Sequence, residues 1–175
     1  MKGAFAIPPS DPLDPLEFLS PDLAAPEAVW RSPLERALAG APEGVEDLSM
    51  TAKIEVRGNV DELQVDGEVI RITPRRALVL APYERGAELR VRLREQADFV
   101  VDVTAAYAGL RVHGEALMRR LTDLDLGALP AVGSVARVQA FVLRDEGESF
   151  RLFFPQEYGH YLAEVVVDTA SGLTR

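Results

Sequence analysis

The sequence predicts a mainly β fold, namely a small antiparallel β-barrel or paired split barrels built from a tandem repeat. A proline-rich N-terminal arm and one or two short helices complete the prediction. Three observations support it: apolar and polar residues alternate with a period of two after Ser49, turn residues recur at short intervals, and residues 52–96 resemble residues 99–143. In the repeat, turn glycines recur in register with strand valines, each 47 positions further on. The recurring residues of the first copy are Val56, Leu63, Val65, Gly67, Glu68, Ala81, Gly86, Arg90 and Val91.

Three parts follow from this pattern: a proline-rich acidic arm (1–48), a first β unit (49–97), and a second β unit with a C-terminal extension (98–175). Eight of the twelve prolines precede residue 45, where they remove backbone donors and fix φ. The arm is therefore not expected to be a regular domain. Within it, a capping box that begins at Ser32 predicts a short helix over residues 33–39.

Large apolar side chains are spaced along the acidic arm. They are Phe18, Leu19, Val29 and the single tryptophan, Trp30. One interpretation is a docking peptide that presents these side chains to a partner. The other is that the arm folds back over its own β body and covers a sheet edge or the open end of the core. The sequence leaves both open.

Period-two alternation places the strands. They are predicted over residues 52–56, 63–72, 77–81, 87–94, 98–104, 110–113, 135–143 and 149–154. The clearest is 87–94, where leucine and valine alternate with charged residues. Residues 115–121 predict one or two helical turns. The tail is ambiguous, because residues 158–164 tolerate a helix whereas Val165 to Val167 favour a strand, and we prefer the strand.

Composition excludes several classes of protein. A formal net charge of −9 opposes general nucleic-acid binding, which needs cations that displace counterions from phosphates. Cysteine is absent, which excludes disulfides, thiolate metal sites and a cysteine nucleophile. No run approaches the ~20 apolar residues of a membrane span, and the start of the chain is too short and proline-broken for a signal peptide. We expect a cytoplasmic protein without a membrane partner.

Arginines concentrate in residues 71–94, which hold seven of them and only two acids, Glu84 and Glu88. A guanidinium binds phosphate through two parallel hydrogen bonds and stacks on purines, as recognition of a small nucleotide requires. Three of these arginines, Arg90, Arg92 and Arg94, fit the solvated face of a sheet because they alternate with apolar residues. Arg75 and Arg76 do not, because they follow Pro74 in what should be a linker between strands.

Arg75 and Arg76, followed by residues 102–112 (DVTAAYAGLRV), resemble the order of motifs in PilZ domains. Those are small β-barrels in which an arginine pair on a linker and an Asp/Asn-x-Ser-x-x-Gly turn bind cyclic di-GMP. The resemblance covers roughly residues 74–154. It implies a PilZ-like shape, with phosphate and guanine contacts from an arginine, polar contacts from the turn, and a close turn at its glycine. The ligand-site residues that it implies are Arg75, Arg76, Asp102, Thr104 and Gly109.

The motif departs from the PilZ pattern in three respects. Val79 and Leu80 stand where a second arginine would follow four residues after the pair, Thr104 replaces serine, and two extra residues precede Gly109. A site without half of its arginine clamp loses charge-assisted hydrogen bonds worth about 1.5–3 kcal/mol each. A second resemblance joins Arg76-Ala77-Leu78 to the Arg-Cys-Leu centre of YceD-like ribosomal RNA accumulation proteins, without the cysteines of that motif.

Aromatic residues are densest near the C-terminus, in residues 150–155. Alternation sends Phe150, Leu152 and Phe154 to one face and Phe153 to the other, where it is expected to meet solvent, a partner or the arm. The candidates for binding a protein partner, or a second copy of the chain, are Phe18, Trp30, Phe153 and Tyr158.

Catalysis has little support in the sequence. His113 and His160 lie far apart, no metal-ligand spacing accompanies them, and no phosphate-binding glycine loop occurs. We therefore expect a non-catalytic regulatory or scaffold module of PilZ-like shape that binds a protein partner, without a cofactor or metal. The alternatives are a functional cyclic di-GMP receptor, a YceD-like ribosome-associated protein, and a hydrolase or transferase that works through Asp or His.

Overall fold

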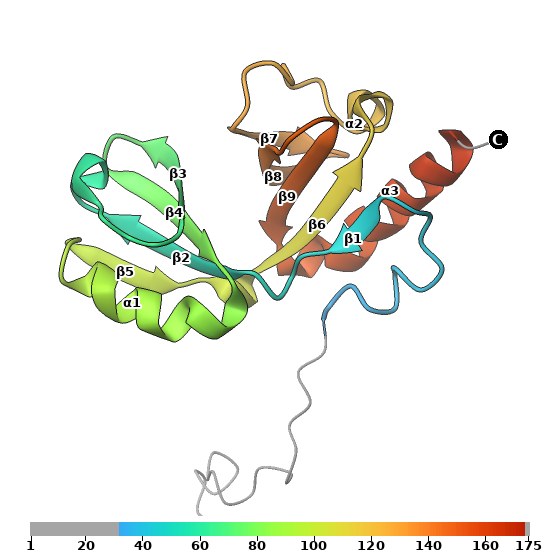
Figure 1. Cartoon of the computed structure of the whole chain (residues 1–175). Helices are drawn as coiled ribbons and strands as arrows, with labels where there is room; N and C mark the ends of the chain where they lie inside the picture. The colour runs from blue at the N-terminus through green and yellow to red at the C-terminus, as the bar shows by residue number, and fades with distance from the viewer. Residues whose placement is uncertain (1–31, 174–175) are drawn as a thin grey trace, which may run out of the picture. The chain divides into compact units, whose positions relative to one another are not determined.

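The computed structural model describes residues 32–173, which form two antiparallel sheets and three α-helices (Figure 1). Sheet A has the order β1-β6-β9-β8-β7, and its strands are β1 (Val45–Asp47), β6 (Tyr107–His113), β9 (Ser149–Pro155), β8 (Val138–Arg144) and β7 (Ala131–Val135). Sheet B has the order β3-β4-β2-β5, and its strands are β3 (Glu68–Thr73), β4 (Arg76–Ala81), β2 (Ala52–Arg57) and β5 (Phe99–Asp102). The helices are α1 (Gly86–Arg94), α2 (Glu115–Leu121) and α3 (Gly159–Leu173).

The mainly β prediction is confirmed, but neither sheet closes into a barrel. Each sheet ends in two different edge strands, β1 and β7 in sheet A and β3 and β5 in sheet B. Most predicted strands are present, because alternation with β-branched and aromatic residues suits a pleated surface that is packed on at least one side. Short 3-10 turns lie between the longer elements, at Val60–Glu62, Tyr83–Arg85, Thr104–Ala106 and Gln156–Tyr158.

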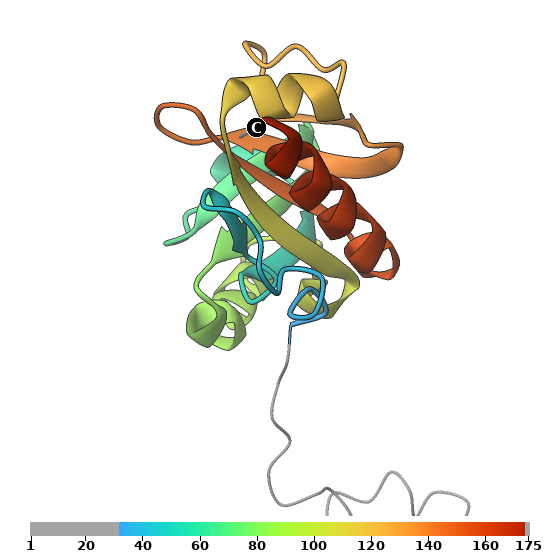
Figure 2. The same cartoon turned by 90° about the vertical axis from the view of Figure 1, so that its right-hand side faces the viewer.

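Four layers follow from the packing of the two sheets. Helix α1 covers one face of sheet B, where Leu89 and Leu93 contact Ile54 and its neighbours in β2 and β4. The other face of sheet B packs against sheet A through a smaller cluster that includes Leu78 and Phe153. Helices α2 and α3 cover the far face of sheet A, as Figure 2 shows for α3, and bury the largest cluster. Each sheet therefore has apolar residues on both faces.

In the sequence, the strands of sheet B are inserted between β1 and β6, which are neighbours in sheet A. β1 pairs with β6 in antiparallel register, from Val45 opposite Val112 to Asp47 opposite Leu110, and the whole of sheet B lies between them in the sequence. The chain crosses tightly where it leaves sheet A: the amide of Leu48 donates to the carbonyl of Gly109 at 2.8 Å. A Cβ on Gly109 would lie 2.8 Å from the carbonyl oxygen of Leu48, so only glycine fits this position without a shift.

The last part of the proline-rich arm packs on sheet A. Leu34 is fully buried in the cluster under α2 and α3, and β1 continues the sheet edge. The short helix predicted over residues 33–39 is instead a run of turns, in which the Ser32 hydroxyl accepts from the amide of Leu34 at 3.0 Å. Strand β1 was not predicted, because it is only three residues long and lies within the proline-rich segment.

Two predicted strands are helices. Residues 87–94 belong to α1, where Leu89 and Leu93 are buried and Val91 is 57% exposed. Leucines four residues apart fit one face of a helix as well as one face of a strand, so the alternation did not distinguish the two. The tail forms α3, and its valines are accommodated because Leu162 and Val166 pack on sheet A. The predicted helix at 115–121 is confirmed as α2.

The tandem repeat does not correspond to repeated structure. Shifted by 47 residues, β3 would coincide with α2, and α1 would coincide with the end of β7 and most of β8. Segments that the repeat equates thus follow different paths. The shared valines and glycines reflect the general demands of strands and turns, which recur in any β-rich chain.

Candidate functional site

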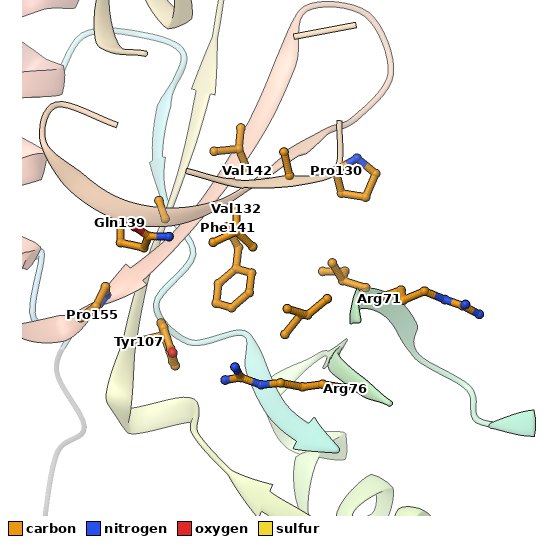
Figure 3. A pocket seen from close by; sticks show the side chains of 13 residues that line it. Arg71, Arg76, Tyr107, Pro130, Val132, Gln139, Phe141, Val142 and Pro155 are labelled. Carbon is orange, nitrogen blue, oxygen red and sulfur yellow. The ribbon is translucent and has the colours of Figure 1, made fainter. Parts of the chain in front are cut away.

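A cleft of about 400 Å³ opens where the two sheets diverge, between β3 and β4 on one side and β7 and β8 on the other (Figure 3). The residues that line it are Ile70, Arg71, Ile72, Arg76, Tyr107, Pro130, Ala131, Val132, Gln139, Ala140, Phe141, Val142 and Pro155. These residues come from six strands and one loop. We name this feature the inter-sheet cleft.

The walls of the inter-sheet cleft continue the apolar interface between the sheets. Ile70 and Phe141 belong both to the buried cluster between the sheets and to the wall of the cleft. Beyond them the sheets separate, and Val132 on β7 is 43% exposed. Apolar surface that faces apolar surface across a gap is the usual character of a binding cleft. Both flanking strands, β3 and β7, are edge strands with one unpaired side.

Arg76 supplies the charge at the inner end of the cleft. Its Nη2 donates to Oε2 of Glu55 at 2.7 Å, and Glu55 also accepts from Nε of Arg57 at 3.0 Å. Burial tends to raise the pKa of Glu55, but the hydrogen bonds from the two arginines outweigh it and hold the pKa below its usual value of 4.5. Nε of Arg76 is buried and has no hydrogen-bond acceptor within residues 32–173.

Tyr107 and Arg71 complete the polar groups of the cleft. The Tyr107 ring meets Phe141 edge to face, with centroids 5.7 Å apart. Figure 3 shows the Tyr107 hydroxyl on the same side of Phe141 as the guanidinium of Arg76. Arg71 lies at the mouth, its head directed away from Phe141, and forms an ion pair with Asp61.

Lys53 is fully buried where the chain crosses between the sheets. Its Nζ donates to the carbonyls of Ser49 and Thr51 at 2.9 and 2.8 Å, and lies 5.6 Å from the centroid of the Phe153 ring. Burial lowers the pKa of Lys53 to about 8, and the nearby charges of Asp102 and Asp47 oppose that decrease. The Lys53 side chain is buried because β2 is covered on both faces.

The residues implied by the PilZ resemblance do not share one site. Arg75 is in a turn and pairs with Asp98 at 3.1 Å, whereas Arg76 begins β4 and pairs with Glu55. Asp102 accepts from the amide of Thr104 at 3.0 Å.

The other two implied residues lie at the crossing between the sheets. The hydroxyl of Thr104 accepts from the amide of Lys53 at 2.9 Å. Gly109 lies against Leu48. Of the five implied residues, only Arg76 lines the cleft.

The predicted partner-binding residues have three different outcomes. Phe18 and Trp30 lie outside the described residues. Phe153 is fully buried between the sheets, so the prediction that it meets solvent or a partner is wrong: sheet B covers that face of β9. Tyr158 is 48% exposed and Tyr161, on α3, is 46% exposed.

The histidines do not enter the cleft. His113 ends β6, and His160 on α3 lies 3.1 Å from Glu164 one turn further along the same helix. Within residues 32–173, no group of three or more metal-binding side chains is present. No helix among the described residues is long and apolar enough to span a membrane.

The cleft itself was not predicted. Its walls come from β3, β8 and the ends of β6 and β9, which lie far apart in the sequence and look like ordinary strand residues there. The one available signal was Arg76, an arginine that begins an apolar run.

Comparisons with known proteins establish the fold. No protein-family model matches the chain, and no curated protein matches it significantly. A solved structure that matches is a chain of heterotetrameric sarcosine oxidase from Corynebacterium sp. U-96 in complex with pyrrole 2-carboxylate. It is 16% identical, with 83% of this chain and 97% of that chain covered and a TM-score of 0.68. The two chains therefore share a fold.

Two further structures give weaker matches. The aspartokinase alpha and beta subunits are 17% identical, with 75% of this chain and 99% of that chain covered and a TM-score of 0.44. The ligand-free regulatory subunit of aspartate kinase from Thermus thermophilus is 14% identical, with 72% and 97% covered and a TM-score of 0.47. At these scores neither likeness supports a conclusion about this chain.

Proposed function

We propose that this chain is a cytoplasmic, non-catalytic module that acts by binding a protein partner, as one subunit of a heteromeric assembly. The observation that carries the proposal is the inter-sheet cleft, whose apolar walls extend the interface between the sheets into solvent between two edge strands. Apolar strand faces and unpaired edges of this kind are features that protein partners bind.

The shared fold supports the part of the proposal that concerns a heteromeric assembly. The matching chain belongs to a heterotetrameric enzyme, and the match spans 97% of that chain, so a fold of this size serves there as one chain of the assembly. We infer the same kind of role here. The partner is expected to supply any chemistry, because the polar groups of the cleft are arginines, a tyrosine and an amide rather than a nucleophile paired with a base.

The experiment compares two valines on edge strands. Val132 on β7 lines the cleft and is 43% exposed, whereas Val69 on β3 is 38% exposed and does not line it. The full-length chain, with an affinity tag at its C-terminus, is purified from the cells that produce it, and light scattering measures the mass of the complex. We expect a complex of fixed stoichiometry with other chains, which Val132→Arg disrupts and Val69→Arg leaves intact.

Three results would count against the proposal. A monomer of the chain alone would refute binding to a partner, and a mass that is a whole multiple of the chain would indicate self-association instead. If both arginine variants disrupt the complex equally, the cleft is not the binding surface.

The PilZ-like and YceD-like interpretations stay predictions. A cyclic di-GMP receptor would need Arg75 and Arg76 to act together, but Arg75 pairs with Asp98 and does not line the cleft, whereas Arg76 pairs with Glu55 and does. We therefore favour the protein-binding role over the nucleotide receptor.

A further inference from the structure

We propose that the inter-sheet cleft recognises a carboxylate attached to a large apolar group, and that the partner supplies it as an acidic side chain next to an apolar one in an extended segment. This inference rests on the proposed function, because it describes the chemistry of the partner at the same site. It is built from the charge at the inner end of the cleft, the apolar walls and the two strand edges.

The charge at the inner end is positive by one unit. Glu55 is the single carboxylate that both Arg57 and Arg76 contact, at 2.9 and 2.7 Å, and its side chain is only 11% exposed. Two guanidiniums against one carboxylate leave one positive charge unneutralised. Arg76 directs that charge into the cleft, and its buried Nε has no acceptor within the described residues.

A monoanion fits this charge better than a polyanion. A second arginine, Arg71, lies at the mouth, but it pairs with Asp61 and its head is directed away from Phe141. The chain as a whole carries a net charge of −9, which repels ligands with several phosphates. A single carboxylate can accept from Arg76 and from the hydroxyl of Tyr107 on the same side of Phe141.

The walls select an apolar neighbour for that carboxylate. Ile70 and Val132 line the cleft from opposite sheets. Phe141 lies between Val132 and Arg76 (Figure 3). A volume of about 400 Å³ accommodates a large side chain and part of the backbone beside it. The free edges of β3 and β7 flank the mouth and offer backbone hydrogen bonds to an extended segment.

The probe is 2-naphthoate, a rigid apolar group with one carboxylate, and its matched neutral control is 2-naphthamide. Each is titrated into the full chain labelled at isoleucine methyl groups, so that Ile70 and Ile72 report on the cleft. We expect 2-naphthoate to shift both signals in a saturable way and to bind about tenfold more tightly than the amide. Added salt should weaken the binding of naphthoate and leave the amide unaffected.

Arginine variants test the assignment to Arg76. Arg76→Gln should reduce the affinity for naphthoate to that for the amide. Arg57→Gln removes one of the two positive charges on Glu55 and should weaken the preference. Arg75→Gln changes neither Glu55 nor the lining of the cleft, so it should keep the preference. Arg76→Lys keeps a positive charge and should retain part of the preference, which provides a test if the glutamine variant does not fold.

Outcomes separate this inference from the proposed function. Equal binding of acid and amide, no shift of the isoleucine signals, or a preference that survives Arg76→Gln would overturn it. If Val132→Arg disrupts the native complex and Arg76→Gln does not, partner binding stands and carboxylate recognition fails. If no complex forms while naphthoate binding depends on Arg76, the cleft binds small carboxylates and the protein-binding role fails.

Discussion

Replacing Lys53 with methionine should change how the stability of the protein depends on pH. The Lys53 ammonium is fully buried at the crossing between the sheets, where it donates to the carbonyls of Ser49 and Thr51 and lies over the ring of Phe153. The charged groups that face it are Asp102 and Asp47. Methionine keeps the length and apolar stem of the side chain and removes the titrating group.

The magnitude follows from the pKa of Lys53. Burial lowers it from 10.5 to about 8, so between these values the unfolded chain binds a proton that the folded chain does not. Stability therefore increases as the pH rises through this range. One pKa unit corresponds to about 1.36 kcal/mol, so the titration of Lys53 should raise the free energy of unfolding by about 3 kcal/mol as the pH rises to the upper end of this range. Between pH 7 and pH 10 the rise should be about 2.5 kcal/mol.

Urea unfolding of both proteins at pH 7 and pH 10 provides the assay. Other groups that titrate in this range affect both proteins alike, so the quantity to compare is the difference in unfolding free energy between them. That difference should shift by about 2.5 kcal/mol in favour of Lys53 on going to pH 10. A difference that stays constant, or that shifts the other way, would refute the assignment of a lowered pKa to a buried lysine.

Three further predictions concern other parts of the fold. Gly109→Ala should lower the free energy of unfolding by about 1–3 kcal/mol, because the added Cβ would lie 2.8 Å from the carbonyl oxygen of Leu48 and 2.9 Å from the Phe153 ring. Gly172→Ala in α3 is the control, since nothing lies within 4 Å of the new Cβ, and thermal unfolding should show no loss. The pKa of Glu55 lies below 4.5, so its contribution to stability is complete above pH 4.5 and is lost as the pH falls through the lower folded value. Glu55→Gln should flatten the acid limb of stability against pH, and an unchanged limb would show that Glu55 does not contribute. Calorimetry with cyclic di-GMP should give no saturable heat, because Arg75 and Arg76 pair with different carboxylates; saturable heat that disappears in Arg75→Ala/Arg76→Ala would establish the receptor instead.

The sequence predicted the strands of the fold better than its helices. β2 and β4 have alternating or continuous apolar residues and were predicted within one residue at each end. α1 was missed because Leu89 and Leu93 satisfy both a period of two and a helical repeat, and the choice depends on packing against β2. α3 was missed because its run of valines has a high strand propensity, which contacts with sheet A override.

Site residues were harder to predict than elements. Arg75 and Arg76 were singled out as a pair, but Arg75 lies in a turn and Arg76 begins β4, and the two arginines bind different acids. Lys53 and Glu55 alternate with apolar residues in β2, and the structure buries both. Sequence periodicity identifies a face but not what covers it, and the partner layer here comes from β8 and β9, about ninety residues later.

The pairing of β1 with β6 makes the segment from Leu48 to Ala106 a very long loop of a single β-hairpin. Leu48, at the start of that loop, is hydrogen-bonded to Gly109, three residues beyond its end, so the segment can be excised and its ends rejoined by a tight turn without breaking a pairing within sheet A. A shortened chain of this design would retain the three strands beyond β6 and both helices that cover them. Architecture of this kind lets one layer be exchanged for another while the remaining scaffold is conserved.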